Sequence, residues 1–108
     1  MAKQISLGKK EINLINKYVI LLKKKGIKVS KVILFGSHAK GMAKPDSDID
    51  IAVISPQFGQ NNLKEMMFLR KLALEIDSQI EPLPLSPQDL EDRYSTLSEE
   101  IRKYGVLI

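Results

Sequence analysis

Two carboxylates interrupt a strongly apolar stretch of this 108-residue chain. Residues 48–54 read Asp-Ile-Asp-Ile-Ala-Val-Ile, so acidic and apolar side chains alternate before a continuous apolar run begins. Side chains of a β-strand point alternately to its two faces, and short β-branched runs are typical of strands. The pattern therefore predicts a strand over Ile49–Ile54, with Asp48 and Asp50 on one face and the intervening isoleucines turned toward the core.

Two other short apolar runs extend this prediction to a sheet. Val29–Phe35 is rich in β-branched residues and ends at a glycine, so it reads as a buried strand. Gln79–Leu85 contains Pro82 and Pro84, which cannot donate hydrogen bonds to a neighbouring strand, so this run is expected at a sheet edge. Residues 106–108 could add a final strand.

Helical periodicity and capping signals alternate with these strands. Such signals occur over residues 8–25, from Asn61 or Asn62 to Ile76, at Ser86–Asp89 and at Thr96–Glu99. Gly26 is expected as the left-handed C-cap of the first helix. The order of elements predicts one α/β (α+β) domain over residues 1–108, with a small mixed sheet flanked by helices.

Composition narrows the chemistry that this domain could perform. The 44% share of apolar residues is ordinary for a folded domain. There is no cysteine, which excludes disulfides and cysteine-based zinc sites, and the single histidine excludes a multi-histidine metal site within one chain. Any bound metal is therefore expected to be a hard ion held by carboxylates.

The charge of the chain is uneven. Its net charge is +4 and its pI about 9.3. Residues 1–44 contain eleven lysines and one acid, whereas residues 45–108 contain twelve acids and six bases. The basic half could attract nucleic acid or nucleotide phosphates, or it could be a solvated lysine-rich surface. No apolar run approaches the roughly 20 residues of a membrane-spanning helix, and residues 1–4 lack a signal-peptide core, so a cytoplasmic location is expected.

A pattern suited to phosphate binding follows the strand that ends at Phe35. Gly36 lets the backbone approach an anion closely, and the free N–H groups of a short helix over about residues 38–43 would attract it. Ser37 can cap that helix and add a hydroxyl hydrogen bond. Lys40 and Lys44 lie where they could neutralise phosphate charge.

The acidic and glycine-containing segments each match part of another motif. An EF-hand loop that starts at Asp46 would need Gly and Glu where the chain has Ile51 and Gln57. A Walker A loop would need Lys followed by Ser or Thr where the chain has Met42 and Ala43. Both interpretations are therefore excluded.

Asp48 and Asp50 then read as a metal site. Two carboxylates on one strand face repel each other unless a cation lies between them. Mg²⁺ would relieve that repulsion and bridge a triphosphate, and two such ions about 3.5–4 Å apart can stabilise both the attacking and the leaving oxygen. The adjacent phosphate turn makes a metal-bound triphosphate the expected ligand.

Taken together, these residues resemble a known family. Residues 35–37, Phe-Gly-Ser, and residues 48–50, Asp-Ile-Asp, are similar in kind and spacing to the signature of the nucleotidyltransferase fold of the DNA polymerase β superfamily. The resemblance is greatest to its small single-domain group, the minimal nucleotidyltransferases. The specific match covers residues 32–54, and residues 80–87 and 101–105 resemble the family more weakly.

The resemblance implies transfer of a nucleoside monophosphate, usually AMP from ATP, with pyrophosphate leaving and two Mg²⁺ ions held by Asp48 and Asp50. It also implies a third catalytic and metal-binding carboxylate on a later strand. Glu81 is the candidate because it is the acid of the third predicted strand, and an exposed edge-strand acid is the alternative. The implied nucleotide-binding residues are Gly36, Ser37 and Lys40.

The chain departs from this family at the short helix. Relatives often carry arginines there, where this chain has His38 and Lys40. Lysine is still a point charge for phosphate, but it lacks the fork of arginine. His38 is expected as a solvated helix residue, and Arg102 and Tyr104 as ordinary residues of the last helix.

Three functions remain open at this point. The first is AMP transfer to a hydroxyl, which in small relatives can be a tyrosine of a HEPN-type partner, an all-helical ribonuclease toxin. The chain would then be the antitoxin of a two-gene pair, in a homo- or hetero-oligomer. The second is a binding module that neutralises its partner by occlusion. The third is transfer to a small-molecule hydroxyl, and nucleic acid is not expected as a direct substrate.

Overall fold

The computed structural model describes residues 8–44 and 46–108. Its elements are α1 (Lys9–Lys24), β1 (Lys31–Phe35), α2 (Gly36–Ala39), β2 (Ile49–Ile54), α3 (Asn62–Ile76), β3 (Ile80–Leu85), α4 (Pro87–Leu90), α5 (Thr96–Tyr104) and β4 (Val106–Leu107). The four strands form one sheet in the order β3-β2-β1-β4. β2 and β3 are parallel, whereas β1 is antiparallel to both β2 and β4. The predicted order of elements and the mixed sheet are confirmed.

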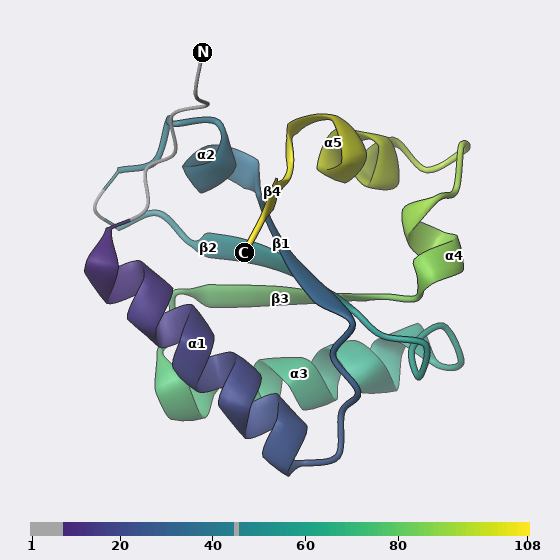
Figure 1. Cartoon of the computed structure of the whole chain (residues 1–108), viewed down its shortest axis with the longest axis horizontal. Coiled ribbons are helices and arrows are strands. Elements are labelled where there is room, and N and C mark those ends of the chain that lie inside the picture. The colour runs from purple at the N-terminus through teal and green to yellow at the C-terminus, as the bar shows by residue number, and fades with distance from the viewer. Residues whose placement is uncertain (1–7, 45) are drawn as a thin grey trace.

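The helices cover the two faces of this sheet unequally (Figure 1). Helices α1 and α3 lie on one face, and α4 and α5 lie on the other, while Ala39 of the short α2 packs in the α1/α3 cluster. The α1/α3 side holds the larger core cluster, to which β2 contributes Ile49, Ile51 and Val53. The second cluster, on the α4/α5 side, includes Ala52 and Ile54 of the same strand. Because Ile49 and Ile51 are fully buried, the predicted inward face of this strand is confirmed.

Strand β3 lies at the sheet edge, as its prolines predict. It pairs with β2 alone, and the register sets Asp50 opposite Glu81 and Ile51 opposite Pro82. The parallel crossover from β2 to β3 runs through α3, which begins where Asn61 accepts a hydrogen bond from the Lys64 amide. This connection brings two acidic residues, 31 positions apart in sequence, onto neighbouring strands.

The C-terminal end of α1 agrees with its predicted cap, whereas the N-terminal end of α5 does not. Gly26 has a φ of +88°, and the Ile27 amide donates to the Leu22 carbonyl at 3.0 Å, so the predicted left-handed C-cap of α1 is confirmed. Helix α5 instead begins one residue earlier than the predicted box. Its N-cap is Ser95, whose side chain accepts from the Ser98 amide, because this serine is the residue with extended backbone before the first turn.

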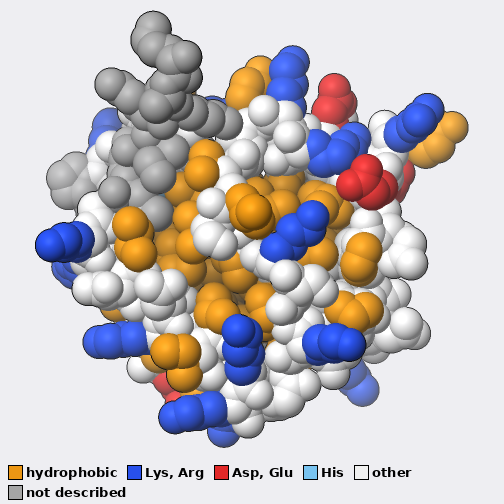
Figure 2. Space-filling model, viewed as in Figure 1, with side chains coloured by type: hydrophobic (Ala, Val, Ile, Leu, Met, Phe, Trp, Pro, Cys, Tyr) orange, Lys and Arg blue, Asp and Glu red, His pale blue; other side chains and the backbone are white. Residues whose placement is uncertain are grey.

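The basic character of the first half of the chain is visible on the surface. Figure 2 shows apolar side chains gathered on one face, with Lys and Arg side chains around them. A groove of about 220 Å³ lies between α1 and β1, with Val19, Val29 and Ile108 in its lining and Lys23 and Lys31 beside them. Within the described part of the chain, no helix combines the length and the apolar composition that crossing a membrane requires.

Candidate active site

The turn between β1 and α2 is shaped by a close approach of backbone to carboxylate. Gly36 has a φ of +72°, a conformation that side chains other than glycine rarely adopt. A Cβ atom on Gly36 would lie 2.3 Å from Oδ2 of Asp50, which is closer than any real contact of this kind. Both the backbone angle and the space therefore require glycine, and the turn is pressed against the Asp50 carboxylate.

The helix after this turn is shorter than expected and begins earlier. Helix α2 spans four residues, and its N-cap is Phe35, with no side-chain capping bond. The expectation that Ser37 caps a helix over about residues 38–43 is therefore wrong. Ser37 lies inside the first turn, because the positive φ of Gly36 already turns the chain out of β1.

Asp50 lies at the centre of the candidate site. It is the second residue of β2, is half-buried, and lies in register between Phe35 of β1 and Glu81 of β3. Asp48 is exposed and immediately precedes the strand. Burial, followed by the nearby charges of Asp48 and Glu81, raises the pKa of Asp50 above its ordinary value. The site thus concentrates negative charge that a cation would relieve.

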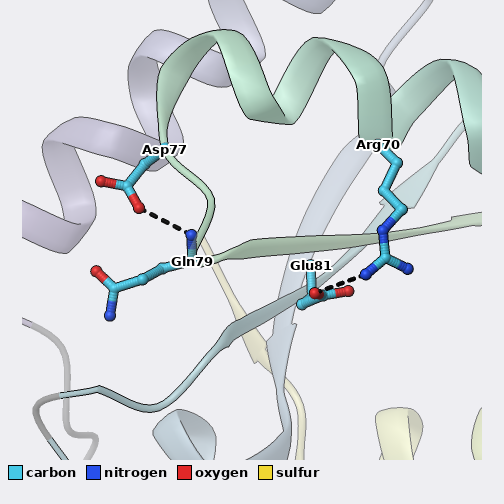
Figure 3. Close-up of polar contacts among 4 residues, drawn as sticks. All are labelled: Arg70, Asp77, Gln79 and Glu81. Carbon is cyan, nitrogen blue, oxygen red and sulfur yellow. Dashed lines mark hydrogen bonds and ion pairs between the residues drawn. The ribbon is translucent and has the colours of Figure 1, made fainter.

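Glu81 is held by a residue that the sequence did not single out. Nη2 of Arg70, on α3, donates to Oε1 of Glu81 at 2.9 Å (Figure 3). At the turn before β3, the Gln79 amide donates to Oδ1 of Asp77 at 2.8 Å, which fixes where this strand begins. No local signal marks Arg70, because its pairing depends on how α3 packs beside the edge strand.

His38 contradicts its expected place. It is 4% exposed, whereas a solvated helix residue was expected. Its Nε2 lies 3.4 Å from the Ser47 carbonyl oxygen, and its proximity acts to lower the pKa of Asp50 against the effects that raise it. The reason for the burial is that α2 packs against β1 and β2, so one side of this short helix faces the sheet.

Lys40 is exposed and pairs with side chains of α5. Its Nζ lies 2.6 Å from Oε1 of Glu100 and 5.1 Å from the centroid of the Tyr104 ring. Tyr104 was expected as an ordinary residue of the last helix, but its ring contacts Lys40 of the candidate site. Arg102 was expected as an ordinary residue too, but it makes a contact with α4. Nη1 of Arg102 donates to the Leu90 carbonyl, which ties α5 to α4. Lys44 is exposed, and its amide donates to Oγ of Ser47 at 2.8 Å, closing the turn before β2.

The carboxylates present are the kind of donor that a hard metal ion prefers. They are too few to fill its coordination shell, so phosphate oxygens and water would have to supply the remaining ligands. Among residues 8–44 and 46–108, no group of three acidic or histidine side chains is arranged to hold a metal. Mg²⁺ is usually bound by one or two carboxylates together with substrate phosphates and water. Asp48 and Asp50 supply such oxygens, whereas Glu81 is turned toward Arg70. The donor chemistry therefore fits Mg²⁺ brought in with a phosphate ligand.

The mixed sheet, with a glycine turn pressed against Asp50, agrees with the resemblance to nucleotidyltransferases. Residues 15–104 match the model of the nucleotidyltransferase domain family, and the chain belongs to this family. The matched region includes Gly36, Asp48, Asp50 and Glu81.

Relatives of this family resemble the chain in sequence and in structure. MJ1305 of Methanocaldococcus jannaschii, described as a candidate protein adenylyltransferase, is 31% identical over 83 residues, which are 72% of this chain and 56% of that protein. The chain thus spans about half the length of this curated relative. A crystal structure of a nucleotidyltransferase candidate from Sulfolobus solfataricus matches the fold with a TM-score of 0.65, at 22% identity over 94% of this chain and 88% of that one.

Two solved toxin–antitoxin structures are also similar. One contains AMP-PNP and matches with a TM-score of 0.61 at 29% identity. The other is a mutant of MntA–HpeT and matches with a TM-score of 0.60 at 27% identity. Each match covers 85% of this chain and 69% of the other chain.

Proposed function

We propose that this protein is a Mg²⁺-dependent enzyme that transfers AMP from ATP to a hydroxyl group of a partner protein. The observation that carries the proposal is the contact of the Gly36 turn with Asp50, because it sets a phosphate-binding backbone beside a metal-binding carboxylate. The AMP-PNP in a similar toxin–antitoxin structure supports ATP as the nucleotide.

The residues of the site have distinct roles in this proposal. The turn at Gly36 and Ser37 and the ammonium of Lys40 bind the triphosphate. Asp48 and Asp50 hold Mg²⁺, which when bound supplies positive charge between the carboxylates and the phosphates. The acceptor oxygen attacks the α-phosphorus of ATP, the bond from that phosphorus to the bridging oxygen of the β-phosphate breaks, and pyrophosphate leaves.

Glu81 is proposed as the group that receives the proton of the acceptor hydroxyl. Leu83 and Leu85, which follow it at spacings of two and four, pack in the same cluster as Ala52 and Ile54 of β2. By the two-residue period of a strand, Glu81 and Asp50 therefore face the same side of the sheet. Arg70 fixes Glu81 there and would position its carboxylate near the attacking oxygen.

We propose a tyrosine of a HEPN-type toxin as the acceptor, with this chain as its antitoxin. Three similarities support a partner protein as the acceptor, namely a relative described as a candidate protein adenylyltransferase and two toxin–antitoxin structures, and the resemblance to minimal nucleotidyltransferases suggests the HEPN-type tyrosine. In the MntA–HpeT mutant, two aspartates two positions apart are replaced by glutamate, which is the spacing of Asp48 and Asp50.

The test is label transfer from α-labelled ATP to the product of the neighbouring gene in the presence of Mg²⁺. Asp48→Asn and Asp50→Asn should each slow transfer by roughly 10²-fold or more, because a metal contributes several kcal/mol to the transition state. Asp46→Asn removes the same charge from an exposed neighbour and should transfer normally. Undiminished labelling by the Asp48 and Asp50 variants would refute the metal site.

The same variants separate catalysis from occlusion. If the Asp50→Asn protein still neutralises the toxin although it transfers no label, binding alone suffices and the antitoxin is not acting as an enzyme. If label instead passes to an aminoglycoside-like hydroxyl added as a competitor, the acceptor is a small molecule.

A further inference from the structure

Helix α5 places an acidic side chain directly on the lysine that the proposed function assigns to phosphate. Nζ of Lys40 donates to Oε1 of Glu100 at 2.6 Å, across 60 residues of sequence. The two side chains are 35% and 36% exposed, so the pair is reachable by a ligand. The same lysine lies over the ring of Tyr104, four residues further along α5. The ammonium of Lys40 is therefore already paired on one side with a carboxylate and an aromatic ring.

Glu100 is presented by a helix that is well fixed on the sheet. Ile101, its neighbour, is 1% exposed and belongs to the core cluster on this face. Oγ of Ser98 donates to the Asp89 carbonyl at 2.7 Å, and Arg102 binds the Leu90 carbonyl, so both sides of Glu100 are anchored to α4. The backbone of Glu100 is thus held in place, and its carboxylate is directed by the bond to Lys40.

A hollow of about 450 Å³ opens on the same side of α5, and its lining includes Leu97, Glu100 and Tyr104. Glu100 thus borders this hollow and binds Lys40, so a triphosphate that binds the Lys40 ammonium comes against the Glu100 carboxylate.

We infer that Glu100 is an internal competitor of the nucleotide phosphates. It pairs with the Lys40 ammonium and so limits how tightly the site binds a triphosphate. This inference rests on the proposed function in taking Lys40 as a phosphate-binding residue. Glu100 takes up one of the three N–H donors of the Lys40 ammonium and part of its charge, and a carboxylate left beside a bound phosphate repels it. Displacement of the Glu100 side chain would consequently alter nucleotide affinity without touching the metal-binding aspartates.

The experiment is calorimetric titration of the whole chain with inorganic triphosphate and with ATP, each with and without Mg²⁺. Partly exposed ion pairs contribute modestly, so Glu100→Gln should bind metal-free triphosphate about two- to five-fold more tightly than the wild type. Glu99→Gln makes the same charge change on an exposed neighbour that lines the same hollow, and it should leave the affinity unchanged because the Lys40 ammonium is paired with Glu100. The gain should shrink as salt is raised from 0.05 to about 0.5 M.

A double-mutant cycle assigns the gain to the pair. Lys40→Met should weaken triphosphate binding, and Glu100→Gln should add nothing in that background, because its effect passes through Lys40. A ligand-free readout is the rate at which an amine-reactive reagent acylates Lys40, measured by peptide mass spectrometry. Glu100 raises the pKa of Lys40, so this rate should increase in Glu100→Gln and stay constant in Glu99→Gln.

The outcomes separate the two proposals. If the wild type binds triphosphate and Glu100→Gln binds it equally or more weakly, the competitor role is overturned while the nucleotide site stands. If Glu99→Gln gives the same gain, net charge is the cause and the role of Glu100 is again overturned. If neither the wild type nor Glu100→Gln binds triphosphate or ATP, the proposed function fails, and the competitor role fails with it.

Discussion

Replacing Asp50 by asparagine should make the protein more stable and less active at the same time. The substitution keeps the size of the side chain that packs against Gly36 and removes its charge. Asp50 lies directly opposite Glu81 on the neighbouring strand, and like charges so placed destabilise a sheet by roughly 0.2–1 kcal/mol. Arg70 beside Glu81 offsets part of this repulsion, whereas the partial burial of Asp50 adds to its cost. A gain of about 0.5–1 kcal/mol in the free energy of unfolding is expected.

The pH dependence gives the sign of this effect. The pKa of Asp50 is raised in the folded protein, so the folded state holds this proton more tightly than the unfolded state does. Stability is therefore lost as pH rises from about 4, the pKa of an aspartate in an unfolded chain, through the raised folded pKa. Asp50→Asn abolishes that loss, so its advantage should be present at pH 7 and absent near pH 3.

Thermal unfolding followed by circular dichroism at pH 3, 5 and 7 measures this advantage. A gain of 0.5–1 kcal/mol corresponds to a rise in Tm of about 2–6 °C for a domain of this size. Asp46→Asn, an exposed acid in the preceding turn, should show no such pH-dependent rise. Mg²⁺ with ATP should stabilise the wild type and not Asp50→Asn. A variant that is less stable than the wild type at pH 7, or equally improved at pH 3 and 7, would refute the reasoning.

Three further substitutions test the packing that supports the site. Gly36→Ala should lower the free energy of unfolding by about 2–4 kcal/mol, because alanine is strained at a φ of +72° and its Cβ would collide with Asp50. Chemical denaturation would measure this loss, and a loss below about 1 kcal/mol would contradict the close approach. Tyr18→Phe should cost about 1 kcal/mol in the same assay, because it removes a buried 2.7 Å hydrogen bond from the hydroxyl to the Leu69 carbonyl that joins α1 to α3. Gly105→Ala should lower Tm by several degrees, because an added Cβ would lie 2.3 Å from a carbonyl oxygen of α5, and an unchanged Tm would argue against this contact.

Local patterns in the sequence are sufficient to predict the elements and their order. The alternation of acids and isoleucines around Asp50 predicts a strand with one buried face, and the prolines of β3 predict an edge strand. The C-cap at Gly26 follows from the same kind of local evidence. These predictions succeed because side-chain periodicity and backbone restrictions act within a few residues.

The wrong predictions concern the exact residue at which a helix begins and the buried side of a short helix. The N-cap of α5 is Ser95 instead of Thr96, and α2 starts at Gly36 instead of after Ser37. At the start of α5, the adjacent Ser95 and Thr96 offer equivalent capping groups, so the sequence alone does not choose between them. The burial of His38 was missed because a four-residue helix is too short for periodicity to reveal its inner side.

Local sequence patterns suffice to predict the residues proposed for phosphate and metal chemistry: the Gly36 turn, the carboxylates Asp48 and Asp50, and the acid of the edge strand. The partners of these residues, Arg70 for Glu81 and Glu100 for Lys40, follow from the tertiary structure. Strand register and helix packing bring together side chains that are far apart in sequence, and no local period encodes such a pair.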